Sequence, residues 1–294
     1  MICAKVQELA EKDPSPVSVA RRLSASYSLS LSPGTVRHWM VGDRKPSVTG
    51  WVRNIFKELP SPELSYVIGA NKGDGCTLPK SGVVKLEVTD KDFAQAFNAN
   101  MAALFSRAKS NKIFVRRRAD RLPMYIVKYS CRPLVRLLRG PLKKLFEIAS
   151  AFPREFLRGF FDAEGFVEVA AKTFFDARVG AENCNRTLLS GARRMLQVVF
   201  HISSTLHLKR NPTSLKTIRG ESFLTKRASY RLLIVRDDQI ERFGSLVGFS
   251  IHRKMQKLED VLNVLRTKKP KERTAAWKEI YLKRNGEWKR RWAT

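Results

Sequence analysis

An internal repeat limits how this chain can fold. The segment 64–75, LSYVIGANKGDG, overlays on the segment 156–165, FLRGFFDAEG, when the sequence is shifted by 90 residues. Small, apolar and acidic positions then coincide in the same order: Val67 with Leu157, Gly69 with Gly159, Gly73 with Ala163, Asp74 with Glu164, and Gly75 with Gly165. Self-similarity of this kind predicts two related structural units, each of which contributes one copy of the segment.

Both repeated segments are typical of a helix that ends at a glycine, and an acid directly precedes that glycine. Asp74 and Glu164 would therefore lie in the last helical turn, where the negative end of the helix dipole opposes an ionised carboxylate. A second carboxylate nearby would oppose it further. A bound divalent cation reverses both effects, so the pattern predicts a metal site.

Small residues recur at a spacing of four in both helices, as Gly69 and Gly73 in the first and Gly159 and Ala163 in the second. Glycine inside a helix costs about 0.5–1 kcal/mol relative to alanine, so its repeated use indicates close backbone contact. Two such stripes packed together would bring both acids to shared metal ions. The alternative is that each acid pairs with a nearby base and that the glycines only permit ordinary core packing.

The sequence that follows each helix is rich in strand patterns. In the first unit, Val84, Leu86 and Val88 alternate with polar residues, which predicts a strand with one buried face. Further strands are expected at Ile113–Arg118, Met124–Tyr129, Phe166–Ala170, Phe174–Val179, Thr205–Arg210 and Tyr230–Arg236. Amphipathic helices are expected at Lys91–Leu104, Pro133–Ala149, Arg186–Phe200 and Asp237–Leu246. This order predicts an α+β fold of antiparallel sheets covered by helices on one face.

The chain divides into four predicted parts: a helical module at 1–60, the two repeat units at 61–150 and 151–266, and a basic tryptophan-containing tail at 267–294. In the module, Ser32 is a good N-cap and Pro33 a good first helical residue, and the helix should end at Gly42 before Arg44-Lys45-Pro46. An earlier helix around Val19–Leu23 completes a pattern typical of a helix-turn-helix, with Arg37 and His38 available to DNA. An ordinary helical hairpin is the alternative.

Charge indicates the class of partner. The chain has 56 Lys and Arg against 27 Asp and Glu, a formal net charge of +29. Such a chain predicts a nucleic-acid partner, because phosphate neutralisation releases counterions and relieves self-repulsion. The four cysteines form no disulfide or zinc pattern, and no signal core or stretch of 18 apolar residues occurs, so we expect a cytoplasmic, nucleoid-associated monomer without a membrane partner.

The motif Leu157–Gly165, LRGFFDAEG, resembles the name-giving sequence of the LAGLIDADG homing endonucleases at Leu, Gly, Asp, Ala and Gly. The segment Leu64–Gly75 is similar to the variant of this motif that ends in G-D-G, although Asn71 and Lys72 replace the usual apolar residues. The junctions at Val88–Phe93 and Val179–Arg186 and the segment Val247–Leu258 also resemble the family, so the likeness spans about residues 60 to 266.

The resemblance implies two pseudo-symmetric αββαββα units that form a β-saddle on double-stranded DNA, with the motif helices at the interface. It implies Mg²⁺-dependent cleavage of both strands of a long, nearly asymmetric site, of the kind used in intron homing. The implied metal ligands are Asp74, Glu164 and the carbonyls of Gly73 and Ala163. The implied residues that order water or assist catalysis are Asp90 or Lys91, Asn185 or Arg186, and Lys254.

Side chains that alternate with the buried strand residues are the expected DNA contacts, because lysine and arginine read guanine or hold phosphate. They are Lys85, Glu87, Arg116, Arg118, Lys128, Arg178, Lys209 and Arg231. The tail, with Trp277, Trp288 and Trp292, is expected either to grip phosphate or to anchor on the core.

Two other functions stay open at this stage. The chain could be an RNA maturase that binds intron RNA, or a non-catalytic transcription regulator that combines the same fold with a helix-turn-helix. A regulator predicts degenerate acids, whereas both acids are present here.

Overall fold

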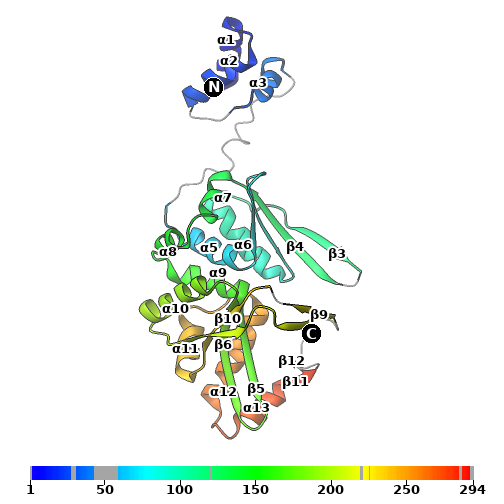
Figure 1. The fold of residues 1–294 in the computed structure, drawn as a ribbon, viewed down its shortest axis with the longest axis vertical. Helices are drawn as coiled ribbons and strands as arrows, with labels where there is room; N and C mark the ends of the chain where they lie inside the picture. The colour runs from blue at the N-terminus through cyan, green and yellow to red at the C-terminus, as the bar shows by residue number, and fades with distance from the viewer. Residues whose placement is uncertain are drawn as a thin grey trace. The chain divides into compact units, whose positions relative to one another are not determined.

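The structure is a computed structural model that describes residues 2–27, 31–42, 59–119, 121–218, 221–224, 226–284 and 287–291. The chain separates into two compact units, Met1–Ile55 and Phe56–Thr294 (Figure 1). Within the described ranges, no helix is both long and apolar enough to cross a bilayer.

The smaller unit contains the helices α1 (Ile2–Lys12), α2 (Pro16–Tyr27) and α3 (Pro33–Met40). They enclose a core of their own, formed by Val6, Val19, Ala20, Leu23, Val36 and Trp39. The predicted start of α3 is confirmed, because the Ser32 side chain accepts a hydrogen bond from the Thr35 N–H over 3.1 Å and Pro33 is the first helical residue. Gly42 adopts a positive φ of 77° just after the helix, and the predicted stop at Arg44-Lys45-Pro46 lies outside the described residues.

The first half of the larger unit begins with the helix of the first motif. Its elements are α5 (Pro62–Gly73), β1 (Gly75–Leu78), β2 (Val83–Val88), α6 (Lys91–Leu104), β3 (Phe114–Arg118), β4 (Arg121–Ser130), α7 (Arg132–Leu138) and α8 (Leu142–Ala149). Ser61 caps α5 by accepting from the Leu64 N–H over 3.1 Å. The strands form an antiparallel sheet in the order β1-β2-β4-β3.

One prediction for this half needs correction, and one strand was missed. The single helix expected over Pro133–Ala149 is wrong, because α7 ends before Gly140 and α8 begins after Pro141. Proline lacks an N–H and disfavours helical geometry in the residue before it, so the pair Gly140-Pro141 breaks the helix. Strand β1 was not predicted, since its four residues carry no clear alternation of apolar side chains.

The second half repeats the plan with an insertion. Its elements are α9 (Pro153–Glu164), β5 (Gly165–Ala171), β6 (Phe175–Asn183), α10 (Arg186–Phe200), β7 (Thr205–Arg210), β8 (Leu215–Ile218), β9 (Glu221–Leu224), β10 (Ser229–Ile234) and α11 (Asp237–Leu246). The antiparallel sheet has the order β5-β6-β10-β7, and β8 and β9 form a separate hairpin between β7 and β10.

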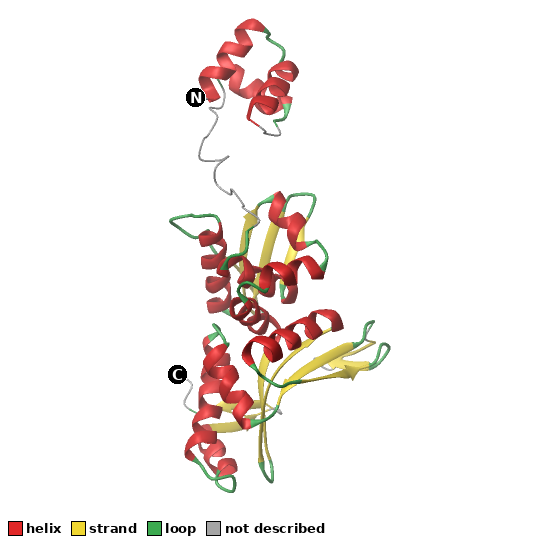
Figure 2. Cartoon of the chain, turned by 90° about the vertical axis from the view of Figure 1, so that its left-hand side faces the viewer, coloured by secondary structure: helices red, strands yellow, loops and turns green. Residues whose placement is uncertain are grey.

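The two sheets therefore have the same strand order once β10 takes the place of β4. This confirms the predicted α+β fold with two pseudo-symmetric αββαββα units. Helix α9 lies between the two sheets beside α5, as Figures 1 and 2 show.

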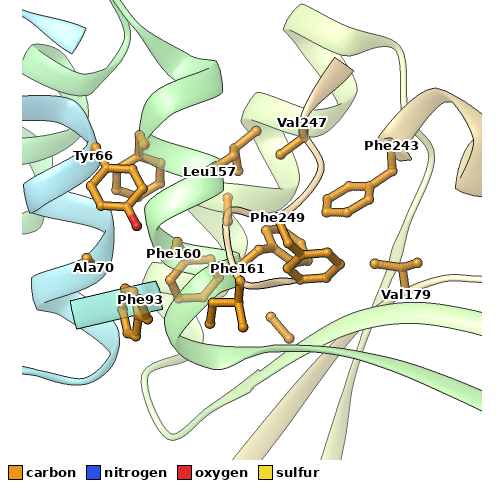
Figure 3. Packing of buried hydrophobic residues seen from close by; sticks show 14 of the residues in the cluster. Tyr66, Ala70, Phe93, Leu157, Phe160, Phe161, Val179, Phe243, Val247 and Phe249 are labelled. Carbon is orange, nitrogen blue, oxygen red and sulfur yellow. The ribbon is translucent and has the colours of Figure 1, made fainter. Parts of the chain in front are cut away.

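Both halves share one hydrophobic core. In Figure 3, Tyr66 on α5 lies beside Leu157 and Phe160 of α9. On the far side of α9, the Phe161 ring packs against Phe243 with ring centroids 4.8 Å apart. Burial of such large aromatic side chains supplies most of the stabilising free energy at a helix interface, so the motif helices are part of the fold itself.

The chain continues into α12 (His252–Thr267), α13 (Arg273–Ile280), β11 (Tyr281–Arg284) and β12 (Glu287–Arg290). Trp277 of α13 is fully buried and stacks on Tyr281 with ring centroids 4.1 Å apart. Its ring also lies 5.7 Å from that of Phe175 on β6. Of the two expectations for the tail, Trp277 therefore serves as a core anchor, while Trp292 lies outside the described residues.

Candidate active site

The glycines of α5 and α9 let the two helix backbones touch. A Cβ atom built on Gly69 would lie 2.1 Å from the carbonyl oxygen of Phe156, and one built on Gly159 would lie 2.3 Å from that of Tyr66. Any side chain at either position would overlap the facing backbone. The close contact predicted from the small-residue stripes is confirmed.

The same packing brings the two helix ends together. A Cβ atom built on Gly73 would lie 2.3 Å from the Cβ atom of Ala163 and 3.0 Å from the Cγ atom of Glu164. Asp74 is the C-cap residue of α5, and Glu164 is the last residue of α9. The two acids of the repeat therefore meet at one place in the molecule.

The electrostatic environment of both acids opposes ionisation. Burial, followed by the charge of Asp74, raises the pKa of Glu164 to about 7, although Asn183 and Lys254 act in the opposite direction. Burial also raises the pKa of Asp74, with the charge of Asp90 adding to it and that of Lys254 opposing it. Two neighbouring carboxylates disfavour each other's ionisation, and a cation bound between them would stabilise the ionised forms of both.

Asn183, near the end of β6, is the amide that contacts the site. Its Nδ2 atom donates to Oε1 of Glu164 over 2.6 Å, and its Oδ1 atom accepts from the backbone N–H of Asn185 over 2.7 Å. Asn185, which the family resemblance singles out, instead caps α10 by accepting from the Leu188 N–H over 3.1 Å. Sequence reasoning missed Asn183, because only the register of β6 against Gly165 distinguishes the two asparagines.

Lys254 lies beneath the end of α9. The side chain is only 7% exposed, and its Nζ atom donates to the carbonyls of Asp162 over 2.5 Å, Phe161 over 3.2 Å and Ala163 over 3.4 Å. These carbonyls are those of the last helical turn, which a cation stabilises. Burial lowers the pKa of Lys254 to about 8. The Ala163 carbonyl, an implied metal ligand, therefore faces an ammonium group.

The remaining implied catalytic residues lie at helix starts. The Asp90 carboxylate makes two hydrogen bonds to Arg253 of α12, over 2.6 and 2.8 Å, and the hydrogen bonding lowers the pKa of Asp90. Lys91 is exposed at the first position of α6, and Arg186 is exposed at the first position of α10, with its guanidinium 6.0 Å from the ring centre of Tyr230.

A buried polar network beside the site was also missed. Tyr66 of α5 donates to Oδ2 of Asp162 over 2.8 Å, and the backbone N–H of Ser250 donates to Oδ1 of Asp162 over 2.8 Å. Burial raises the pKa of Asp162. At the matching position of α5, Lys72 donates to the carbonyl of Leu138 over 2.6 Å. These hydrogen bonds connect α5, α9 and the segment that precedes α12. The one feature of the sequence that could have indicated the network is Asp162, an acid inside the second motif.

The predicted DNA-contact residues divide between two sheets and the small unit. Pairing of β2 with β4 and of β4 with β3 places Lys85, Glu87, Lys128 and Arg116 on the face opposite Leu86 and Val127. Arg118 lies beyond a shift of register in the β3–β4 pair. In the second sheet, Arg178 of β6 alternates with the buried residues Ala177 and Val179. Arg231 of β10 pairs with Glu182 of β6 and precedes the buried end of its strand, and Lys209 lies near an irregularity where the β7–β10 register shifts. Arg37 and His38 are exposed on α3 of the smaller unit.

Comparison with known proteins finds a matching family model and similar sequences. Residues 151–248 match the family model of the LAGLIDADG-like domain. An uncharacterized protein of Methanocaldococcus jannaschii is 28% identical over 262 residues, which are 87% of this chain and 91% of that protein.

Two solved structures are similar at lower identity. The homing endonuclease I-DmoI in complex with DNA and Ca is 21% identical, and the match covers 69% of this chain and 99% of that one with a TM-score of 0.46. Full-length DUF199/WhiA from Thermatoga maritima is 17% identical, and the match covers 78% of this chain and 69% of that one with a TM-score of 0.45.

The chain is thus similar to proteins of the LAGLIDADG class. More particularly, residues 151–248, which include the motif Leu157–Gly165 and form much of the second half of the larger unit, match the LAGLIDADG-like domain, as the sequence predicted.

Proposed function

We propose that this protein is a site-specific DNA endonuclease that cuts double-stranded DNA with one acid from each repeat. The observation that carries the proposal is the meeting of Asp74 and Glu164 at the ends of two helices whose backbones touch. A purely structural interface would gain nothing from two acids with raised pKa values at this point.

The donor set suits Mg²⁺. Within the described residues there is no cluster of three or more His, Cys, Asp or Glu that could hold a metal, so the two carboxylates would bind it together with water and DNA phosphate. Mg²⁺ is commonly held in this way, by one or two carboxylates plus substrate oxygens. Bound there, the ion would supply an activated water and neutralise charge on the transferring phosphate.

The protein's own side chains and backbone would orient and anchor the two acids. Asn183 fixes the orientation of the Glu164 carboxylate through its hydrogen bond to Oε1. Lys254 holds the last turn of α9 and places a positive charge close to both acids. Asp74 has its backbone N–H bonded to the Ala70 carbonyl over 3.2 Å, which anchors it to the end of α5.

The two sheets would provide the DNA-binding surface. Each presents basic side chains on the face opposite the core, and the two faces belong to one unit with a shared core. Two related but non-identical sheets would read a long target whose halves differ, and one chain would suffice as a monomer. We propose that α3 of the smaller unit adds contacts through Arg37 and His38.

The test uses the full-length protein and a plasmid library that carries long randomised inserts. With Mg²⁺, the wild-type protein should linearise a subset of plasmids that share a common sequence, and EDTA should abolish this activity. Asp74→Asn and Glu164→Gln should bind the selected sequence but not cut it. Glu147→Gln, which removes an exposed acid on α8, serves as the matched control and should cut normally.

Two outcomes would change the conclusion. Binding without cleavage by the wild-type protein would favour a DNA-binding regulator with the same fold. Preference for a structured intron RNA over duplex DNA would favour a maturase.

A further inference from the structure

The two sheets carry an acid at equivalent positions of their second strands. The glycine after each motif acid pairs with Leu86 in β2 and with Ala181 in β6. One residue further along each strand stand Glu87 and Glu182. Both belong to the face opposite the core, which is the face proposed to bind DNA.

Glu87 is surrounded by cations from two strands. Its carboxylate forms ion pairs with Lys85 of β2 and with Arg116 of β3, and the Glu87 side chain is only 17% exposed. The hydrogen bond and charge of Lys85, together with Arg116, lower the pKa of Glu87, so the acid stays ionised.

Glu182 is placed in the same way in the second sheet. It forms ion pairs with Lys209 of β7 and, over 3.6 Å, with Arg231 of β10, and its side chain is 26% exposed. Burial raises the pKa of Glu182, but the hydrogen bond with Lys209 and the neighbouring charges outweigh this, and the pKa lies below its ordinary value. Arg231 is held further by Glu168 over 3.1 Å and by the Phe166 ring, whose centre lies 4.8 Å from the guanidinium carbon.

Neither stability nor general DNA affinity explains these acids. Partly exposed ion pairs contribute only about 0–1 kcal/mol to folding. A negative charge at the centre of a basic face also weakens its attraction for phosphate. What such an acid does supply is a fixed geometry for a long side chain that would otherwise have to be ordered on binding.

We propose that Glu87 and Glu182 are a matched pair of specificity-determining residues. Each orients the arginine beside it, Arg116 or Arg231, to read one base pair, and each disfavours DNA that would bring a phosphate to that position. Each acid follows the residue that pairs with the glycine after a motif acid, and Glu182 precedes Asn183, which donates to Glu164, so the base pairs concerned would lie near the cleavage centre, one in each half-site. The inference rests on the proposed binding of duplex DNA by the sheets.

The experiment is a binding selection from a library of randomised duplexes, carried out in EDTA with the full-length wild-type protein, Glu87→Gln, Glu182→Gln and the control Glu147→Gln. Each Gln removes one charge and keeps the size of the side chain. We expect Glu87→Gln to lose base preference at one position in one half of the selected sequence. Glu182→Gln should lose it at the mirror position in the other half, by about tenfold in discrimination if one bidentate arginine contact is disturbed.

The affinity for a random duplex is measured beside the selection. Both sheet variants should bind it more tightly than the wild-type protein, and Glu147→Gln should do so to a smaller extent. Thermal unfolding of all four proteins checks that the fold is kept.

The outcomes separate the two proposals. If the wild-type protein selects no sequence, the proposed function fails. If the wild-type protein selects a sequence and both sheet variants keep the same base preference at every position, the specificity role is refuted while the proposed function stands. The same conclusion follows if Glu147→Gln changes random-duplex binding as much as the two sheet variants do.

Discussion

Asn183 donates a hydrogen bond to Glu164, whereas the equivalent strand position in the first half of the unit is occupied by the buried residue Val88. The two motif acids are therefore held differently. Glu164 has an amide donor from its own sheet, and the matching strand position in the first half carries an apolar side chain that can donate no hydrogen bond to Asp74. The strands therefore add to the asymmetry of the motif helices, in which Asp74 is the C-cap residue of α5 and Glu164 is the last residue of α9.

The first prediction concerns this amide. Asn183→Ala should slow cleavage of the selected plasmid about tenfold or more while changing stability little, because the Glu164 carboxylate loses the group that orients it. Asn185→Ala is the matched control. It removes the N-cap of α10 and should cost about 1 kcal/mol of stability without a comparable loss of cleavage. Single-turnover cleavage and urea denaturation distinguish the two, and equal cleavage losses would contradict the assignment.

The second prediction concerns the helix contact. Gly69→Ala places a methyl group against the Phe156 carbonyl, and relief of the overlap must push α5 and α9 apart. We expect the unfolding free energy to fall by about 1–3 kcal/mol or more. In contrast, a Cβ atom on Gly34 of α3 meets no atom closer than 4.0 Å. Gly34→Ala should therefore leave the main thermal transition unchanged, and an equally mild effect of Gly69→Ala would contradict the packing described.

The third prediction concerns pH. Because the pKa of Glu164 is raised to about 7 in the folded protein, the folded state binds more protons than the unfolded state between pH 4.5 and 7. The unfolding free energy of the metal-free protein should therefore be highest at the acidic end of this window and fall as pH rises through it. The loss is at most about 3 kcal/mol.

Urea denaturation in EDTA across this range measures the effect. Glu164→Gln should flatten the dependence, and Mg²⁺ should restore stability to the wild-type protein at the alkaline end, because it binds the ionised form. An unchanged pH dependence in Glu164→Gln would show that other groups are responsible.

The fourth prediction concerns the C-terminal segment. Trp277→Ala should destabilise the larger unit by about 3–5 kcal/mol, since the indole is fully buried against Tyr281 and Phe175. Trp288→Ala is the control, because Trp288 is only partly buried and contacts Trp277 edge to face at 6.5 Å. Its effect on the melting temperature should be clearly smaller, and similar shifts for both variants would argue against Trp277 as the anchor.

The sequence alone was sufficient for the parts of this protein that depend on local pattern. Helices α10 and α11 and strand β7 have the bounds that the spacing of their apolar residues predicts, because this spacing depends only on neighbours within a few residues. The repeat also predicted that α5 and α9 pack through glycines and bring Asp74 and Glu164 together, since repeated glycine inside a helix costs stability and favours close backbone contact as its explanation.

The tertiary structure decided what depends on register and on contacts between distant segments. Strand pairing selects Asn183 rather than Asn185 as the partner of Glu164, and it sets Glu182 beside Lys209 and Arg231. Lys254 reaches the carbonyls of α9 from more than ninety residues away. A one-residue change of register moves a side chain to the other face of a sheet. The register depends on packing across the whole core, and this packing cannot be read from a local sequence pattern.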